Sequence, residues 1–248
     1  MNGVWGLVPS RRSPWNINSR EMANMETVLL AGASRGLGLG LAREYLSRGW
    51  QVVATARDPA KAADLRALAD GGRLRVETLD VARPEQAATL AKTLAGTKLD
   101  VLFVVAGQSK AGYVPIHDVA RDVAAEEFLV NSCAPPAVAE ALLPLLAPGG
   151  TVVFMTSVLG SLARSEGGME LYNASKAALN MLAIGFAKRH PDLRVILMHP
   201  GWVRTDMGGE SAPLDVKTSA RGMVDVVAAR GKGTGVVYVD YAGAELPW

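Results

Sequence analysis

The stretch that decides the fold is residues 27–38, TVLLAGASRGLG, in which an apolar run leads straight into three glycines. The run TVLLA is typical of a strand buried on both faces, because its apolar residues follow one another without alternation. The G-x-x-x-G-x-G spacing then predicts a tight turn into a helix whose first N–H groups can bind phosphate. An ordinary strand-to-helix turn is the alternative for such a glycine triplet.

The same alternation of short apolar strands and helices continues along the rest of the chain. It predicts an α/β fold with a single Rossmann-type domain: a doubly wound, seven-stranded, mainly parallel sheet with helices on both faces. No repeat or low-complexity linker divides it. The expected strands are 27–31, 51–55, 74–79, 101–105, 151–155, 194–198 and 236–239. The expected helices are roughly 37–48, 59–69, 84–95, 121–146, 170–189 and 218–230.

Composition excludes several other classes of protein. The chain has 248 residues and a net charge of +2, and its Lys and Arg residues are scattered, so no nucleic-acid partner is predicted. A single cysteine, Cys133, rules out an intrachain disulfide and favours a reducing compartment. No apolar run approaches the length of a membrane span. We therefore expect a cytoplasmic protein with no membrane partner and no metal site.

Residues 1–24 differ from the rest of the chain, being rich in Asn, Ser, Pro and Arg. They lack the apolar segment of a secretory signal. We expect a flexible N-terminal arm or leader, an expression leftover, a targeting segment, or residues before a later start at Met22 or Met25. Residues 25–248 form the expected dinucleotide-binding catalytic domain.

The end of the second predicted strand, in QVVATARDP at 51–59, indicates which dinucleotide is bound. An enzyme that uses NAD usually has a carboxylate here, whereas arginine suits the 2′-phosphate of NADP. Arg57 follows the strand, and Arg35 in the glycine turn could help it clamp that phosphate. We therefore predict NADP(H), with NAD(H) possible and a solvated Arg57 as the alternative. Asp58 is better interpreted as an N-cap before Pro59.

The third and fourth predicted strands each end in a residue suited to the cofactor. Asp80 could accept a hydrogen bond from the adenine amino group, although an N-cap of the next helix is nearly as plausible. Gly107, in VVAG, gives a second backbone turn beside the cofactor.

Residues 171–180, LYNASKAALN, place Tyr172 and Lys176 one turn apart on the same face of a predicted helix. A neighbouring ammonium favours the phenolate form of a tyrosine. The pair is either an acid/base device or a coincidence of two surface residues, and the spacing alone does not decide between them.

Together these motifs resemble those of the short-chain dehydrogenase/reductase family, over about Thr27 to Trp248. Within the family, the ending YAGAELPW and the short segment after HPGWVRTDMGG are similar to the small C-factor and sniffer-type carbonyl reductases. The features that carry the resemblance occur in family order: GASRGLG, LDV, the AG after strand four, Asn131, Ser157, YNASK and HPGWVRTDM.

The resemblance implies a role for each of four catalytic residues. Tyr172 would be the general acid that protonates a carbonyl oxygen, and its pKa would have to fall toward neutrality for that role. Lys176 would supply a positive field and hold the nicotinamide ribose. Ser157 would bond the substrate oxygen, and Asn131 would hold a water that links Lys176 to solvent. The alternatives are that Ser157 merely ends a strand and that Asn131 is an ordinary polar helix residue.

The expected cofactor contacts come from the glycine turn, the strand ends, the Tyr–Lys pair and the turn after strand six. A plain loop is the alternative for that last turn, and His199 and His117 are expected to be structural. The cofactor-binding residues are Gly32, Ser34, Arg35, Gly36, Leu37, Gly38, Arg57, Asp80, Val81, Ala106, Gly107, Tyr172, Lys176, Pro200, Gly201, Val203 and Thr205.

The chain also departs from the family pattern. Ala31 replaces the usual threonine before the first glycine, and Val104 and Val105 replace two asparagines after strand four. These changes put local stability or cofactor affinity in doubt more than the chemistry. The Gly167–Gly168 pair suggests a mobile loop beside the substrate.

The main hypothesis is an NADPH-dependent carbonyl reductase that acts on a ketone or aldehyde, or on the corresponding alcohol in reverse. The alternative is an NAD(P)-binding signalling or regulatory protein with little turnover; a nucleotide-sugar epimerase is a weaker third. By resemblance, helices 121–146 and 170–189 would form a homodimer or homotetramer. An apolar substrate is favoured by the expected lining, which is Val158, Leu159, Leu162, Trp202 and Met207.

Overall fold

The computed structural model describes residues 25–68 and 71–248, so the predictions about residues 1–24 lie outside the described residues. These residues form one seven-stranded sheet in which all neighbouring strands pair in parallel, in the order β3-β2-β1-β4-β5-β6-β7. The strands are β1 (Thr27–Ala31), β2 (Gln51–Ala56), β3 (Leu74–Thr78), β4 (Leu99–Val104), β5 (Leu146–Met155), β6 (Arg194–His199) and β7 (Gly235–Asp240).

The strand order fixes where a ligand can bind. The chain moves outward from β1 to β3, returns to place β4 beside β1, and then moves outward again to β7. The direction of winding therefore reverses between β1 and β4. In open parallel sheets, a crevice forms at the carboxyl ends of the strands at such a reversal. The predicted doubly wound Rossmann-type fold is confirmed.

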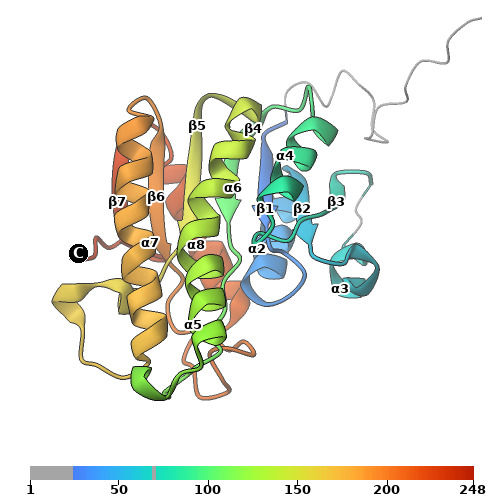
Figure 1. The fold of residues 1–248 in the computed structure, drawn as a ribbon. Coiled ribbons are helices and arrows are strands. Elements are labelled where there is room, and N and C mark those ends of the chain that lie inside the picture. The colour runs from blue at the N-terminus through green and yellow to red at the C-terminus, as the bar shows by residue number, and fades with distance from the viewer. Residues whose placement is uncertain (1–24, 69–70) are drawn as a thin grey trace, which may run out of the picture.

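Helices cover both faces of the sheet (Figure 1). Helix α4, the α5–α6 pair and α7 lie in front of the sheet in Figure 1, with α2 and α8 behind it. Successive strand residues feed two cores, since Leu29 and Ala31 belong to one and Val28 and Leu30 to the other. The helices are α2 (Gly36–Ser47), α3 (Ala63–Arg66), α4 (Pro84–Thr93), α5 (Arg121–Phe128), α6 (Ala134–Leu142), α7 (Glu170–Arg189) and α8 (Val216–Arg230).

Two predicted helices are wrong in detail. The helix expected over 59–69 is a single 3₁₀ turn, Pro59–Lys61, followed by the short α3. The helix expected over 121–146 contains a π-helical turn, η3 (Leu129–Cys133), and ends in a 3₁₀ turn. Pro135 and Pro136 follow η3 and have no N–H to donate to carbonyls one turn earlier, which favours a wider turn there.

The stretch Arg121–Leu145 also bears on the predicted absence of a membrane span. Among the described residues, it is the one helical run long and apolar enough to cross a membrane by length and composition. The run was not evident from the sequence because charged residues open it. Val138, Ala139 and Leu142 on its inner face belong to the core. A core helix commonly passes the same test, so the indication is weak.

The β1–α2 connection is the tightest contact in this part of the fold. Gly32 has a φ of 98°, which favours glycine. A methyl group on Gly38 would lie 2.1 Å from the carbonyl oxygen of Gly32 and 2.7 Å from the Cα of Ala33. Both obstructing atoms belong to the backbone, so the contact cannot be relieved by turning a side chain.

We expect Gly38→Ala to lower the free energy of unfolding by roughly 1–3 kcal/mol, because α2 must move away from β1. The control is Gly185→Ala on α7, where the nearest atom would be 3.9 Å away on a flexible arginine. That change should leave stability equal or raise it by up to about 1 kcal/mol through helix propensity. Urea unfolding of both variants measures the difference, and equal effects would contradict the close contact.

Candidate active site

The N-terminus of α2 opens at the crevice between β1 and β4. Arg35 at the N-cap has an extended backbone and makes no side-chain capping hydrogen bond, and the first turn contains no acidic residue. The first N–H groups of a helix have no partner within the helix, and the helix dipole adds positive potential there. This end fits a pyrophosphate, with Ser34, Gly36 and Leu37 in the surrounding turn.

Thr55, to which no sequence motif pointed, holds this turn in place. Its side-chain oxygen accepts a hydrogen bond from Gly32 N at 3.0 Å, and its carbonyl accepts one from Ala33 N at 2.8 Å. On the other side of β1, the N–H groups of Val105 and Ala106 both donate to the carbonyl of Ala31. In the family, a threonine and two asparagines usually occupy the positions of Ala31, Val104 and Val105. Here backbone hydrogen bonds and the Thr55 side chain connect the glycine turn and the loop after β4 to the sheet instead. The only signal in the sequence was a threonine within the otherwise apolar end of the second strand, QVVATA.

The two arginines predicted to bind phosphate, Arg35 and Arg57, differ in their ion pairs. Arg35 pairs with Asp206 at 2.5 Å, and both side chains are about three-quarters exposed (75% and 77%). Arg57 makes no ion pair with any residue of the described parts of the chain. Asp58 accepts a hydrogen bond from Ala60 N with Pro59 next to it, so the predicted N-cap is confirmed. Of the two arginines, Arg57 is the one without an ion pair among the described residues, although the Glu126 carboxylate interacts with its charge.

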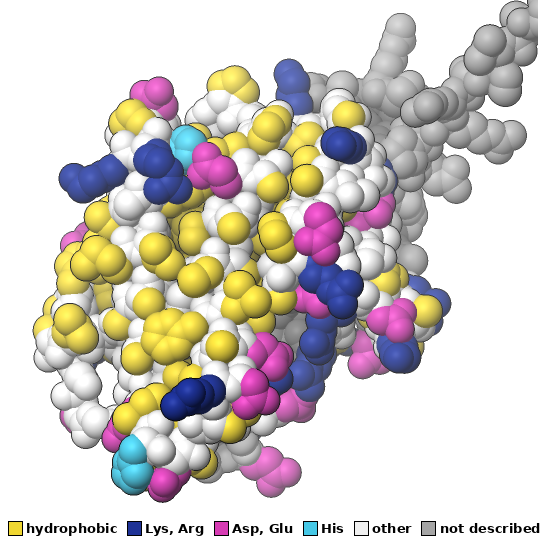
Figure 2. Space-filling model, in the orientation of Figure 1, with side chains coloured by type: hydrophobic (Ala, Val, Ile, Leu, Met, Phe, Trp, Pro, Cys, Tyr) yellow, Lys and Arg dark blue, Asp and Glu magenta, His cyan; other side chains and the backbone are white. Residues whose placement is uncertain are grey.

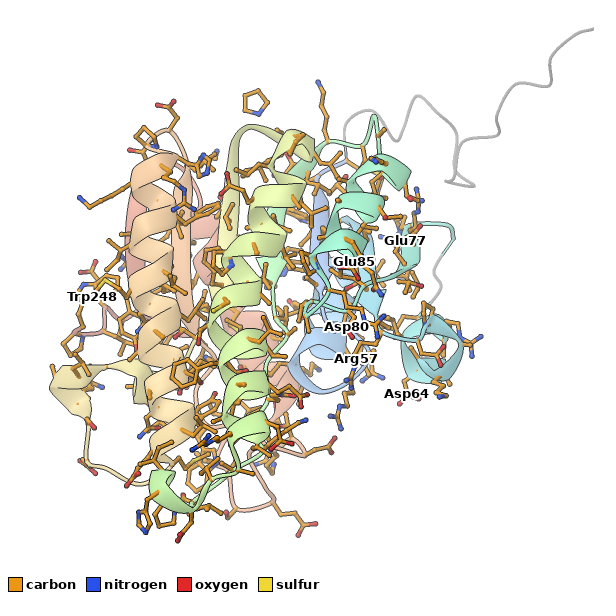
Figure 3. All side chains as sticks on the ribbon, in the orientation of Figure 1. Arg57, Asp64, Glu77, Asp80, Glu85 and Trp248 are labelled. Carbon is orange, nitrogen blue, oxygen red and sulfur yellow. The ribbon has the colours of Figure 1, made fainter. Side chains whose placement is uncertain are left out.

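Asp80 lies beyond β3, next to the end of β2 that carries Arg57 (Figure 3). Its carboxylate accepts a hydrogen bond from Ala82 N at 3.1 Å and lies 3.7 Å from the Arg83 guanidinium. The N-cap of α4 is Arg83. The N-cap alternative for Asp80 is therefore wrong, because the side chain closes a local turn before the helix begins. The neighbouring Val81 is buried.

The turn after β6 reaches back to the glycine turn. A methyl group on Gly36 would lie 3.7 Å from the Thr205 side chain, so these two segments are neighbours. Pro200 accepts a hydrogen bond from the Ser219 hydroxyl at 2.6 Å. Val203 forms a bridge with Leu214. The segment is thus anchored at both ends, and Gly201 within it has a φ of 81°.

Helix α7 carries the Tyr172–Lys176 pair to the carboxyl end of β5. Lys176 is only 2% exposed, and its ammonium donates a hydrogen bond to the carbonyl of Met155 at 3.0 Å. The ammonium lies 5.7 Å from the centre of the Tyr172 ring. A methyl group on Gly107 would lie 3.3 Å from the same ammonium, so the loop after β4 passes beside it.

Asn131 lies in the π-helical turn η3 and faces the same loop. Its side-chain oxygen accepts a hydrogen bond from Gln108 N at 2.8 Å, and its amide donates to the carbonyl of Gln108 at 2.7 Å. The amide also donates to the Ser175 hydroxyl on α7 at 3.0 Å. Asn131 therefore joins η3, α7 and the loop after β4, and its predicted water stays a prediction.

Ser157 is fixed at the end of β5 by contacts that the sequence did not reveal. Its hydroxyl oxygen accepts a hydrogen bond from Leu159 N at 3.2 Å. The Tyr238 hydroxyl on β7 donates to the carbonyl of Ser157 at 2.6 Å. Tyr238 comes from a strand more than eighty positions away, so no local pattern pointed to it.

The pKa of Tyr172 differs from the expected one. Tyr172 is partly exposed, yet burial raises its pKa to about 12, with a hydrogen bond to Ser157 lowering it and Glu127 and Tyr238 raising it further. The expectation that its pKa falls toward neutrality is therefore wrong for the protein itself, because desolvation of the phenolate outweighs the neighbouring groups. At neutral pH Tyr172 is a phenol that can donate a proton.

Lys176 is shifted in the opposite direction. Burial lowers its pKa to about 8, and Glu127 partly opposes this shift. His199, at the end of β6, has its pKa lowered to about 4 by burial, which keeps it neutral. Within residues 25–68 and 71–248, no cluster of three or more His, Cys, Asp or Glu side chains could hold a metal ion.

A hollow of about 580 Å³ opens beside the segment that follows Ser157. The predicted apolar residues Val158 and Leu159 contribute to it, but two charged side chains do so as well. Tyr113, from the loop after β4, lies near Gly168, where a methyl group would be 3.5 Å from its ring. The lining residues are Val158, Leu159, Ala163, Arg164, Ser165 and Glu166.

Known proteins show the same sequence pattern and fold. A short chain dehydrogenase profile matches residues 26–214. The C-signal protein of Myxococcus xanthus is 39% identical over 158 residues, which are 60% of this chain and 93% of that protein. A carbonyl reductase from Pseudomonas aeruginosa PAO1 in complex with NADP shows 41% identity and a TM-score of 0.84, covering 91% of this chain and 100% of that chain. The carbonyl reductase Sniffer of D. melanogaster shows 29% identity and a TM-score of 0.81, covering 91% and 100%.

The buried ammonium predicts an unusual pH dependence of stability. We expect Lys176→Met to raise the free energy of unfolding near pH 7 by on the order of 1 kcal/mol, after the lost hydrogen bond to Met155 is subtracted. Below pH 8 the ammonium is charged in both states, so its desolvation is a full cost to the folded chain. Between the folded pKa of about 8 and the ordinary value of 10.5, the folded chain loses the proton first and this cost disappears.

The advantage of Lys176→Met should therefore shrink as the pH approaches 10. Urea unfolding at pH 7 and pH 10 measures it. Lys188→Met, an exposed lysine on the same helix, is the control and should show no such pH dependence. A Lys176→Met protein that is less stable than the parent at pH 7 would contradict the argument.

Proposed function

Because the chain belongs to the short-chain dehydrogenase family, we propose that it is an NADPH-dependent carbonyl reductase. The observation that carries this proposal is the placement of Tyr172 beside Lys176, whose ammonium lies 5.7 Å from the tyrosine ring, and near Ser157 at the carboxyl end of β5. A ketone or aldehyde is the proposed substrate, and the corresponding alcohol is the product. The family membership confirms the resemblance seen in the sequence.

The residues present fit the proposed cofactor. The open N-terminus of α2 would hold the pyrophosphate, and Arg57 would hold the 2′-phosphate that distinguishes NADPH from NADH. Lys176 would hold the nicotinamide ribose, and the turn after β6 would border the nicotinamide. The related P. aeruginosa carbonyl reductase, whose structure contains NADP, supports this assignment. When bound, NADPH supplies the hydride for the reduction.

The chain itself would supply the proton and stabilise charge. As negative charge develops on the carbonyl oxygen, the Ser157 hydroxyl would donate a hydrogen bond to it and Tyr172 would transfer its phenolic proton. Lys176 would then stabilise the phenolate that remains on Tyr172, until a proton from solvent restores it. Asn131 would hold the loop beside Lys176 and the predicted water.

The substrate is proposed to be apolar near the reacting carbon. Leu162, Trp202 and Met207 are each about half exposed or more, at 80%, 56% and 49%, and lie in segments that follow β5 and β6. Exposed apolar side chains on segments that border a site favour an apolar ligand. The charged side chains of Arg164 and Glu166 also line the hollow. They could bind a polar group on the part of the substrate that is remote from the reacting carbon.

Self-association and a cytoplasmic location also stay proposals. Figure 2 shows many hydrophobic side chains across the face formed by α7 and the α5–α6 helices. Leu129, Met181 and Leu182 are exposed apolar residues on those elements. A homodimer or homotetramer through this face would cover them.

The second candidate function is that of a cofactor-binding regulatory protein with little turnover, and the similarity to C-signal favours it. A panel of ketones and aldehydes with NADPH and with NADH, followed by absorbance, distinguishes the two. Turnover of one compound supports the reductase. Tight NADPH binding without turnover across the panel supports the regulatory protein.

We expect Tyr172→Phe to reduce kcat for any accepted carbonyl by about 10²–10⁴-fold, because the proton donor is lost while the ring remains. NADPH affinity, measured by calorimetry, should change little. A variant that consumes NADPH with that carbonyl at the parent rate would contradict the proposed mechanism.

We expect Arg57→Ala to raise the Kd for NADPH by roughly ten- to a hundredfold and to leave the Kd for NADH almost unchanged, because only NADPH carries the 2′-phosphate. The matched control is Arg43→Ala, which removes an exposed arginine from the outer surface of α2. Equal weakening of both cofactors in Arg57→Ala would show that Arg57 does not bind the 2′-phosphate.

A further inference from the structure

Glu127 is a fully buried carboxylate that the proposed reaction does not use. It lies on α5 and has no exposed surface, whereas its neighbour Glu126 is exposed and pairs with the Lys110 ammonium. One oxygen of Glu127 accepts hydrogen bonds from Lys110 N at 2.7 Å and Ala111 N at 3.4 Å. The other oxygen has no hydrogen-bond partner among the described residues. A buried charge is costly, so such a residue calls for an explanation.

The position of Glu127 relative to Asn131 supplies the first part of that explanation. The two residues are four apart, so they lie on the same side of adjoining helical turns. Asn131 binds the backbone of Gln108, and Glu127 binds the backbone two and three residues further along. Together they hold the segment 108–111. This segment directly follows Gly107. A methyl group on Gly107 would lie 3.3 Å from the Lys176 ammonium, so the chain passes close to that ammonium here.

The charges around the Tyr172–Lys176 pair supply the second part. The titratable groups that act on the pair from the elements around it are Glu127 on α5 and Tyr238 on β7. Burial raises the pKa of Tyr238 to about 12, so it is neutral at physiological pH. Among the described residues, burial has the largest effect on both pKa values, and Glu127 is the carboxylate that acts on both side chains, raising the pKa of each.

We propose that Glu127 is a positioning residue that holds the segment 108–111 beside Lys176 and supplies a negative charge that helps the buried Lys176 ammonium keep its proton. A protonated pair suits the transfer of a proton to a carbonyl oxygen, so in this respect the inference rests on the proposed reductase function. The effect of Glu127 on Lys176 is a property of the chain itself and is measurable without any turnover.

The test follows the titration of Lys176 by NMR in protein labelled with ¹³C-lysine, with the Lys176 signal assigned from its absence in Lys176→Met. Glu127→Gln keeps an oxygen for the N–H groups of Lys110 and Ala111 but removes the charge. We expect it to lower the titration midpoint of Lys176 by roughly one pH unit. The alkaline limit of kcat/KM for carbonyl reduction should move down by the same amount.

Two further variants separate charge from shape. Glu127→Asp keeps the charge, so its Lys176 midpoint should stay close to that of the parent even if the shorter side chain loosens the segment 108–111. Glu126→Gln removes the adjacent exposed charge and should leave the midpoint unchanged. A midpoint unaltered in Glu127→Gln, or lowered equally in Glu126→Gln, would overturn the proposal. Failure of Tyr172→Phe to lose activity would overturn the reductase function but not this midpoint shift.

Discussion

The close packing of α2 against β1 is the constraint on which the arrangement of the site depends. Gly38 has the backbone of Gly32 within 2.1 Å of where a side chain would begin, so α2 can approach the sheet only with glycine at this position. Gly40, on the next part of the helix, likewise admits Val216 of α8, which a methyl group would meet at 2.4 Å. Both contacts fix α2 relative to β1 and α8. Its open N-terminus is thereby held at the point where the winding of the sheet reverses, so the proposed phosphate site depends on the close packing of α2 against β1.

The centre of the site, in contrast, contains two ionisable side chains, Lys176 and Glu127, that are almost fully buried, although burial disfavours a charged group. Among the described residues, Lys176 has one backbone acceptor and no contacting carboxylate, and Glu127 has one oxygen without a hydrogen-bond partner. Uncompensated groups of this kind destabilise a fold and are concentrated where a protein does chemistry. The two large apolar cores on either side of the sheet supply the stability that tolerates them. Stability and the site therefore draw on different parts of the molecule.

What the sequence could predict depended on how local each signal was. Strand β1 and helix α7 have the predicted bounds, because an unbroken apolar run and a long helix-forming segment each contain their own signal. The π-helical turn that carries Asn131 was missed, since its wider winding depends on prolines one turn later and on packing against α7. Thr55 and Tyr238 were missed for a different reason. Their hydrogen-bond partners, Gly32 and Ser157, come from distant segments, and only the pairing of strands brings them together.

The raised pKa of Tyr172 is compatible with a proton donor once the acceptor is considered. The expectation of a pKa near neutrality assumed that the tyrosine must ionise readily at working pH. In reduction the phenol instead has to retain its proton until a carbonyl oxygen becomes an alkoxide. An alkoxide is about as basic as hydroxide, whose conjugate acid, water, is a far weaker acid than a phenol. A phenol with a pKa of about 12 remains the stronger acid, so the transfer is still favourable. The same burial disfavours the phenolate from which the reverse reaction would start, so at neutral pH Tyr172 rests in the protonated form that the proposed reduction needs.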